Sequence, residues 1–174
     1  MTLPVPDPPE RKAPGGLLSE REMLVGWIEL SRDSFQAKCA GLDGEGLALR
    51  SVPPSTLSLT GMLRHLAEVE RHWFVGIFSG EEVEPMFYSE EDFDGDFDGA
   101  TAANAPEALA AWVAACEVSR TVVAGAASLD ASCLHPSRGE LSLRWILLHL
   151  VREYGRHCGH ADLLRQAVDG SVGG

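Results

Sequence analysis

The residues of this chain best suited to chemistry lie near its C-terminal end. Three histidines and one glutamate follow one another there at intervals of three or four residues: His149, Glu153, His157 and His160. An α-helix turns by about 100° per residue, so these side chains fall within an arc of roughly 80° on one helical face. Imidazole nitrogens and carboxylate oxygens are good ligands for divalent transition metals. The spacing therefore predicts a metal site on a helix.

A second pair of histidines supports this prediction. His65 and His72 share one face of the helical segment MLRHLAEVERHWF, so five of the six histidines lie on two helical stripes. We expect the two helices to meet, with a metal ion between them. His72 is two turns from His65 and is expected to lie too far along the helix to bind the same ion.

Four long helices are predicted. The first begins at a capping box formed by Ser19 and Glu22 and ends near Gly41, and the others cover residues 58–78, 104–127 and 142–168. Residues 42–57 and the segment around Pro136 are expected to be loops, because Gly and Pro are frequent there. No strand-like alternation lasts long enough to predict a strand. The predicted fold is all-α, a four-helix bundle with a long acidic loop between its second and third helices, at residues 79–104.

Composition limits the classes of function. The 174 residues fit a disordered leader (1–16), one helical domain (17–170) and a flexible tail (171–174). The net charge of −12 argues against a nucleic acid partner. No apolar run reaches about 18 residues and no signal peptide is visible, so we expect a cytoplasmic protein that does not cross a membrane. The four cysteines are widely spaced and are expected to be free thiols.

The acidic loop contains four aspartates at alternate positions, as a calcium-binding EF-hand loop does: Asp92, Asp94, Asp96 and Asp98. However, Phe97 takes the place of the glycine that the EF-hand turn requires, and no glutamate lies at the twelfth position. We therefore favour a solvated lid over calcium binding. Four aromatic residues of the loop would help it to cover an apolar pocket: Phe87, Tyr88, Phe93 and Phe97.

The segments HLAEVERHWF and EYGRHCGHADLLR, within this helix layout, resemble the DinB-like superfamily, and more narrowly its mycothiol-dependent transferase and maleylpyruvate isomerase branch. The resemblance covers residues 19–170. It implies a divalent metal held by one histidine of the second helix and by a Glu-xxx-His pair of the fourth, which correspond here to His65, Glu153 and His157. His160, one turn beyond His157, is the alternative third ligand in place of Glu153.

Three protein ligands leave coordination positions open for a substrate. Zinc is the preferred metal, with nickel or iron as alternatives. The resemblance implies a transferase or isomerase in which a small thiol, such as mycothiol, attacks a small electrophile. A bundle with a structural or vestigial metal site is the alternative. A di-iron centre and a zincin protease fit the spacing poorly, because the Glu-xx-His pairs and the HExxH motif they need are missing. A heme protein would use one or two axial histidines, whereas three clustered ligands fit a bare ion better.

Further predictions concern residues near the proposed metal site and on the surface. His149 is expected to hydrogen-bond Glu153 or to pack in the core, Glu68 to orient the ring of His65, and His135 to lie on the surface. Four arginines are candidates to hold a carboxylate or a sugar thiol: Arg64, Arg144, Arg152 and Arg156. A homodimer is expected, with the exposed parts of the helices that carry Trp27 and Trp112 as possible contacts.

Overall fold

A computed structural model of the chain describes residues 5–8 and 10–172, which are mostly helical. Its long helical segments are α1 (Glu20–Cys39), α3 (Leu59–Glu70) with its π-helical extension η1 (Arg71–Phe78), α5 (Ala105–Gly125) and α6 (Leu143–Asp169). Two short helices, α2 (Gly44–Ala48) and α4 (Gly95–Asp98), and a hairpin of β1 (Ser132–His135) and β2 (Gly139–Ser142) complete the described elements.

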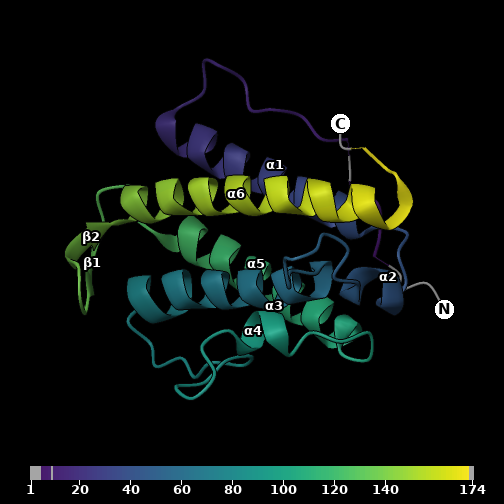
Figure 1. Cartoon of the computed structure of the whole chain (residues 1–174). Helices are drawn as coiled ribbons and strands as arrows, with labels where there is room; N and C mark the ends of the chain where they lie inside the picture. The colour runs from purple at the N-terminus through teal and green to yellow at the C-terminus, as the bar shows by residue number, and fades with distance from the viewer. Residues whose placement is uncertain (1–4, 9, 173–174) are drawn as a thin grey trace.

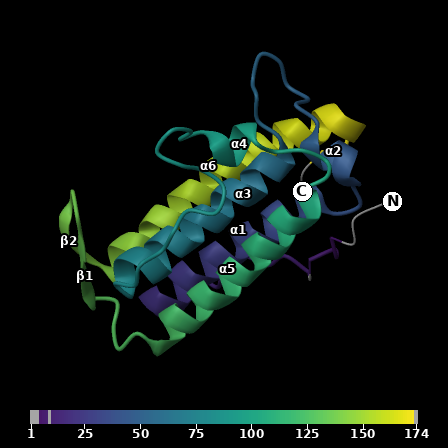
Figure 2. The same cartoon turned by 90° about the horizontal axis from the view of Figure 1, so that it is seen from below.

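The four long helical segments lie side by side (Figures 1 and 2). α1 packs against α6, α3 packs against α5 and also reaches α6, and η1 continues the contact with α5. Large apolar side chains fill the space between the helices and exclude water, which is the main source of stability in such a fold. The fully buried ones are Tyr154, Phe35, Phe74, Leu47, Leu59, Met62, Leu63, Leu66, Leu143, Ile146, Leu147 and Leu150.

Local capping explains where the long helices begin and end. The capping box at the start of α1 is present, since the Ser19 and Glu22 side chains each accept a hydrogen bond from the other's backbone N–H. Ser142 accepts from the N–H of Trp145 at the start of α6, and Gly170 adopts the left-handed conformation (φ 81°) that stops this helix. The four predicted helical segments are therefore confirmed, although the last part of the second is a π-helix.

Two predictions about the connecting segments are wrong. Residues 42–57 were expected to be a loop but contain α2, where the Asp43 side chain caps the helix and Leu47 is fully buried. Gly44 and Gly46 led to the prediction of a loop, because glycine has a low helix propensity. The burial of Leu47 outweighs this low propensity. The segment around Pro136 is a β-hairpin with Ser132 opposite Ser142, and Gly139, at φ 78°, is the first residue of β2 after the turn. Its strands have four residues each, too few to show an alternation.

The N-terminal segment contacts the helices where it is described. Val5 is buried, and the Gln36 side chain donates a hydrogen bond to the Pro6 carbonyl. Residues 1–4 and 9 of the predicted leader, and 173–174 of the predicted tail, lie outside the described residues.

The expected dimer contacts differ in exposure. Trp112 is only 2% exposed and donates a hydrogen bond to the Tyr154 hydroxyl, so a contact through α5 would involve other residues of that helix. Trp27 is 41% exposed and remains available.

By length and composition alone, α5 is apolar enough to cross a membrane. One face of this helix packs against α3 and η1 within the protein. Because core helices of soluble proteins pass the same test, composition is weak support for a membrane span.

Candidate metal centre

Three potential metal ligands converge where α3 meets α6. His65 comes from α3, and Glu153 and His157 lie one turn apart on α6. One ligand atom from each residue lies within 4.8 Å of the other two. Glu153 Oε1 is 3.1 Å from His157 Nε2 and 3.6 Å from His65 Nε2, so the carboxylate lies between the two rings. The structure thus brings together the three residues that the family resemblance implied.

The helical period of α6 turns Glu153 and His157 inward. Leu150, Ala161 and Leu164 are buried on the same helix at intervals of three or four residues from this pair, which places all of them on its inner side. Glu153 and His157 are themselves buried. Burying two polar side chains on an apolar face costs free energy unless they hydrogen-bond to one another or bind another group.

Asp96, from α4, holds the third side chain in place. Its Oδ2 atom is 2.8 Å from His65 Nδ1, and its Oδ1 atom accepts a hydrogen bond from the Phe97 N–H. An ionised carboxylate at Nδ1 favours the tautomer with the proton on that nitrogen, which leaves the Nε2 lone pair directed toward Glu153. His65 Nε2 is buried and has no hydrogen-bond partner in the described part of the chain. This arrangement is typical of a histidine that binds a metal through one nitrogen and a carboxylate through the other.

The protonation states also suit a metal site. Burial, with the nearby His65, lowers the pKa of His157 from 6.5 to about 4. Burial by itself would raise the pKa of Glu153, but the neighbouring His157 and His65 imidazoles bring it below its ordinary value. At neutral pH His157 is therefore a neutral imidazole and Glu153 an ionised carboxylate, the forms that bind metals.

Two residues expected to serve the site directly instead anchor the acidic loop. Arg64 donates hydrogen bonds to the carbonyls of Phe87, Gly95 and Gly99. The carboxylate of Glu68 accepts from the N–H groups of Met86 and Phe87, at 2.6 and 2.8 Å, and does not orient His65. These backbone contacts give Arg64 a structural role, and they place Asp96 beside His65.

Gly61 permits the close approach of α4 to α3. A Cβ atom at this position would lie 3.2 Å from the Phe97 Cα and 3.3 Å from its carbonyl oxygen, closer than is usual for such contacts. Gly61 lies one turn before His65, so the absence of a side chain lets the loop reach the metal centre.

Phe97 packs against the centre, and two cavities lie beside it. Its ring stacks on His65 with the ring centroids 4.6 Å apart, so this part of the lid prediction has a physical basis. One cavity, of about 290 Å³, lies on the side of His65, Tyr88 and Asp96. The other, of about 270 Å³, lies on the side of His157 and is lined by Phe97 itself. Each of the two histidine ligands of the cluster therefore borders a cavity.

The remaining histidines surround the centre without joining it. The His160 ring lies 5.4 Å from that of His157, and its Nδ1 is buried without a partner in the described structure, but His160 is outside the converging group. His149 stacks against Trp145 at 5.3 Å rather than bonding Glu153. His72 lies beside His135, at 6.1 Å, outside the converging group as expected.

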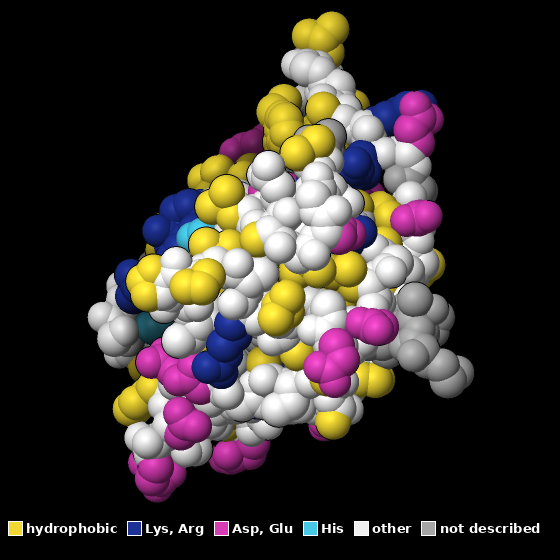
Figure 3. Space-filling view, turned by 45° about the vertical axis from the view of Figure 1, so that its right-hand side comes forward, with side chains coloured by type: hydrophobic (Ala, Val, Ile, Leu, Met, Phe, Trp, Pro, Cys, Tyr) yellow, Lys and Arg dark blue, Asp and Glu magenta, His cyan; other side chains and the backbone are white. Residues whose placement is uncertain are grey.

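The arginine candidates divide into two groups. Arg152 lies 3.4 Å from Glu153 Oε2 and Arg156 lines the His157 cavity, so both are at the site. Arg144 pairs with Glu20 and Asp130 instead. On the face shown in Figure 3, histidine reaches the surface only in small areas beside basic side chains, while acidic side chains gather at the lower end.

The signal for Asp96 was visible in the sequence but was misinterpreted. Its alternation with three other aspartates suggested calcium or a solvated face, whereas the structure buries Asp96 and leaves Asp92, Asp94 and Asp98 exposed. No periodicity links residue 96 to residue 65, because a loop of unpredictable path connects them.

This geometry describes a helical protein with a candidate two-histidine, one-carboxylate metal centre. The comparison with protein families goes further: the model of the mycothiol S-transferase family matches residues 23–170. The chain therefore belongs to this family, which is part of the DinB-like superfamily, and the resemblance seen in the sequence is confirmed. No curated protein matches the chain significantly.

Proposed function

We propose that this protein is a metal-dependent transferase or isomerase that uses a low-molecular-weight thiol, mycothiol or a close analogue, as the nucleophile toward a small electrophile. The observation that carries the proposal is the convergence of His65, Glu153 and His157 beneath Phe97. Membership of the mycothiol S-transferase family supports the thiol as substrate. The architecture that we propose is the four-helix bundle of DinB-like type.

The donor set fits a divalent metal ion. The buried His65 Nε2 lacks a hydrogen-bond partner in the described residues, which costs about 1–3 kcal/mol unless a bound group satisfies it. Two imidazoles and one carboxylate suit zinc, and the same donors accept nickel or ferrous iron. His65, Glu153 and His157 would hold the ion.

When bound, the ion would lower the pKa of a thiol so that it is present as a nucleophilic thiolate at neutral pH. The chain's own residues contribute the rest. Asp96 keeps a proton on His65 Nδ1 and so fixes the direction of Nε2. Phe97 limits access of water from the side of α4. Arg156, beside His157, supplies a positive charge for an acidic group of either substrate.

Metal analysis combined with a thiol assay tests this function. We expect about one divalent ion per chain in the purified protein, and metal-dependent consumption of mycothiol when an electrophile from a panel is added. His157→Ala should abolish both metal retention and turnover, whereas His72→Ala, outside the converging group, should preserve metal retention. Full metal content in the His157→Ala protein would show that the ligand assignment is wrong.

The alternative function is metal binding without catalysis, and His160 is the observation that favours it. If its imidazole, which has a buried unpartnered nitrogen, turned toward the ion, the site would have four protein ligands and no position for a thiol. His160→Ala would then lower metal affinity. In the catalytic case the same variant should retain the ion, and any effect should fall on turnover.

A homodimer, a cytoplasmic location and the absence of a nucleic acid partner remain predictions. The exposed Trp27 supports a contact surface on α1. Sedimentation analysis of the protein and of a Trp27→Lys variant would test the dimer, since a charge at this position should weaken an apolar interface.

A further inference from the structure

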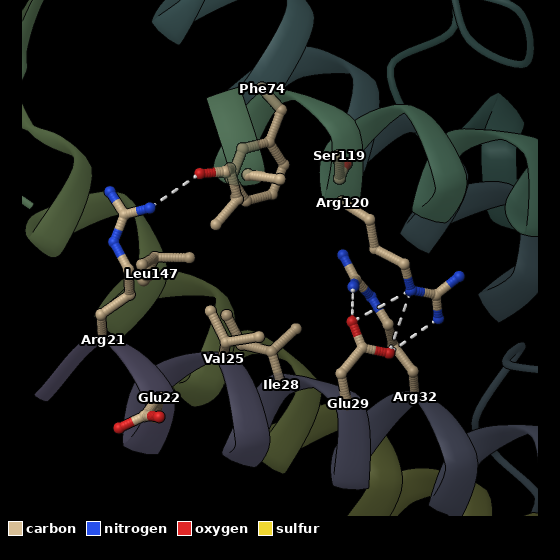
Figure 4. A pocket seen from close by; sticks show the side chains of 12 residues that line it. Arg21, Glu22, Val25, Ile28, Glu29, Arg32, Phe74, Ser119, Arg120 and Leu147 are labelled. Carbon is tan, nitrogen blue, oxygen red and sulfur yellow. Dashed lines mark hydrogen bonds and ion pairs between the residues drawn. The ribbon is translucent and has the colours of Figure 1, made fainter. Parts of the chain in front are cut away.

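A third cavity lies between α1 and α5, away from the metal centre. It has a volume of about 280 Å³ and shares no lining residue with the two cavities beside the metal centre. Its walls are mostly apolar: Val25 and Ile28 from α1 face Phe74 and Leu147, which come from η1 and α6 (Figure 4). A concave, apolar space with a few polar groups is typical of a small-molecule site.

Ser119 places an unsatisfied hydroxyl at this cavity. The residue is 1% exposed, and its Oγ atom has no hydrogen-bond partner in the described structure. Three other helical hydroxyls are satisfied within their own helix, since Ser31, Ser34 and Thr121 each donate to the carbonyl four residues earlier. Thr60, in α3, shares the unsatisfied state of Ser119 but does not line this cavity. A bound molecule with an oxygen atom near Ser119 would supply the missing hydrogen bond.

Arg21 adds a positive charge that no acidic residue of the described chain neutralises. Its guanidinium donates to the carbonyls of Val123 and Ala126, at 3.1 and 2.7 Å, at the end of α5. The other two arginines of the cavity, Arg32 and Arg120, are both paired with Glu29.

The two polar groups lie apart along the cavity. Figure 4 shows Arg21 at one side of the apolar wall and Ser119 toward the other. Along α5, Ser119 and Ala126 are separated by about two helical turns, or roughly 10 Å. Glu22, another acid of the lining, is held by the Ser19 side chain and points away from the apolar wall (Figure 4).

We propose that this cavity binds an elongated, largely apolar carboxylate that carries a hydroxyl or keto group some distance from its acid group. The carboxylate lies at Arg21, the chain packs among Val25, Ile28 and Phe74, and the second oxygen meets Ser119. A molecule with a chain of about eight carbons spans the distance and fits the volume. The site is separate from the metal centre and does not depend on the function proposed for it.

Calorimetry with three probes tests the proposal on the full-length protein: octanoate, octan-1-ol and 8-hydroxyoctanoate. Arg21→Gln should weaken octanoate about tenfold and leave octanol unchanged, because only the acid interacts with the charge. Arg21→Lys should restore much of the affinity. Arg144→Gln is the matched control, since Arg144 lies outside the cavity lining, and it should have no effect.

Ser119→Ala should weaken 8-hydroxyoctanoate by roughly threefold to tenfold without changing octanoate. The protein itself should remain as stable, because this hydroxyl has no partner to lose. Val25→Phe should fill the cavity and abolish binding of all three probes, whereas Val118→Phe, on the exposed side of α5, should not.

Two results would overturn the proposal. One is the absence of saturable binding by octanoate and 8-hydroxyoctanoate to the folded protein. The other is dissociation of a dimer by Val25→Phe, measured by light scattering, which would show that a second copy of the chain covers this face.

Discussion

Two clusters of buried charged side chains lie among the long helices, and their hydrogen bonds differ. Around Glu70, Arg32 binds both carboxylate oxygens at 2.9 and 2.7 Å, and the Tyr154 hydroxyl donates to one of them at 2.7 Å. Trp112 donates to the same hydroxyl, so the groups of this cluster satisfy one another. At the metal centre, His65 Nε2 and nitrogen atoms of two other histidines are buried without partners in the described residues.

This difference in hydrogen bonding distinguishes a cluster that stabilises the fold from a cluster that can bind a ligand. Burial would lower the pKa of Arg32, but Glu70 raises it above its ordinary value, so Arg32 stays positively charged at ordinary pH values. Burial, together with Glu70, likewise raises the pKa of Tyr154. A closed network of this kind connects α1 to the end of α3 and to α6 and has no capacity left for a ligand. The open cluster retains unsatisfied ligand atoms, which is what a binding site requires.

The largest effect on stability is expected when the carboxylate of Glu70 is removed from its hydrogen-bonded cluster. Glu70→Gln removes the carboxylate that neutralises Arg32 and leaves a buried cation, so the free energy of unfolding should fall by about 3–5 kcal/mol. Urea denaturation followed by circular dichroism would measure this loss. Metal affinity of the folded protein should stay the same. A change below about 1 kcal/mol would contradict the structural role of the network.

Replacing glutamate by glutamine at the metal centre should lower metal affinity and leave the stability of the metal-free protein nearly unchanged. Glu153→Gln replaces an anionic ligand with a neutral amide, so we expect metal affinity to fall by at least about 100-fold. Stability of the metal-free protein should change by no more than roughly 1 kcal/mol, because the amide retains a hydrogen bond to His157. Competition with a chelating dye gives the affinity. Unchanged affinity would favour His160 as the third ligand.

The pH dependence of the metal-free protein should reveal the burial of His157. Its pKa is lowered from 6.5 to about 4 on folding, so the unfolded chain binds more protons between these values. The free energy of unfolding should therefore fall on the order of 2–3 kcal/mol as the pH drops from 6.5 to 4. Denaturation in the presence of a chelator measures it. A His157→Gln variant, which cannot titrate at this position, serves as the reference and should show a shallower decline.

The smallest effect is expected at Asp96, which contacts a ligand rather than the ion. Asp96→Asn loses the charge that holds the proton on His65 Nδ1, so metal affinity should fall about 10–100-fold. Asp92→Asn, at an exposed position of the same acidic segment outside both cavities of the metal centre, is the matched control and should have little effect. Equal affinities for the two variants would show that Asp96 does not position His65.

Local sequence signals predicted much of the fold. The capping box at Ser19 and the glycine at 170 mark helix ends whose geometry depends on a few neighbouring residues, and both are present. The helix α2 was missed because two glycines suggest a loop, while its stability depends on burial of Leu47 in the core. Burial of this kind involves distant parts of the chain and leaves no local pattern.

The sequence by itself determined which face of α6 carries Glu153 and His157, because the helical period places residues four apart on one side. It also held the signature of the family, from which the partner His65 follows. Only the tertiary structure decided the remainder. Asp96 orients His65 from a loop 31 residues away, and Arg32 neutralises Glu70 from 38 residues away. Such contacts depend on how loops and helices pack in space, and no spacing along the chain encodes them.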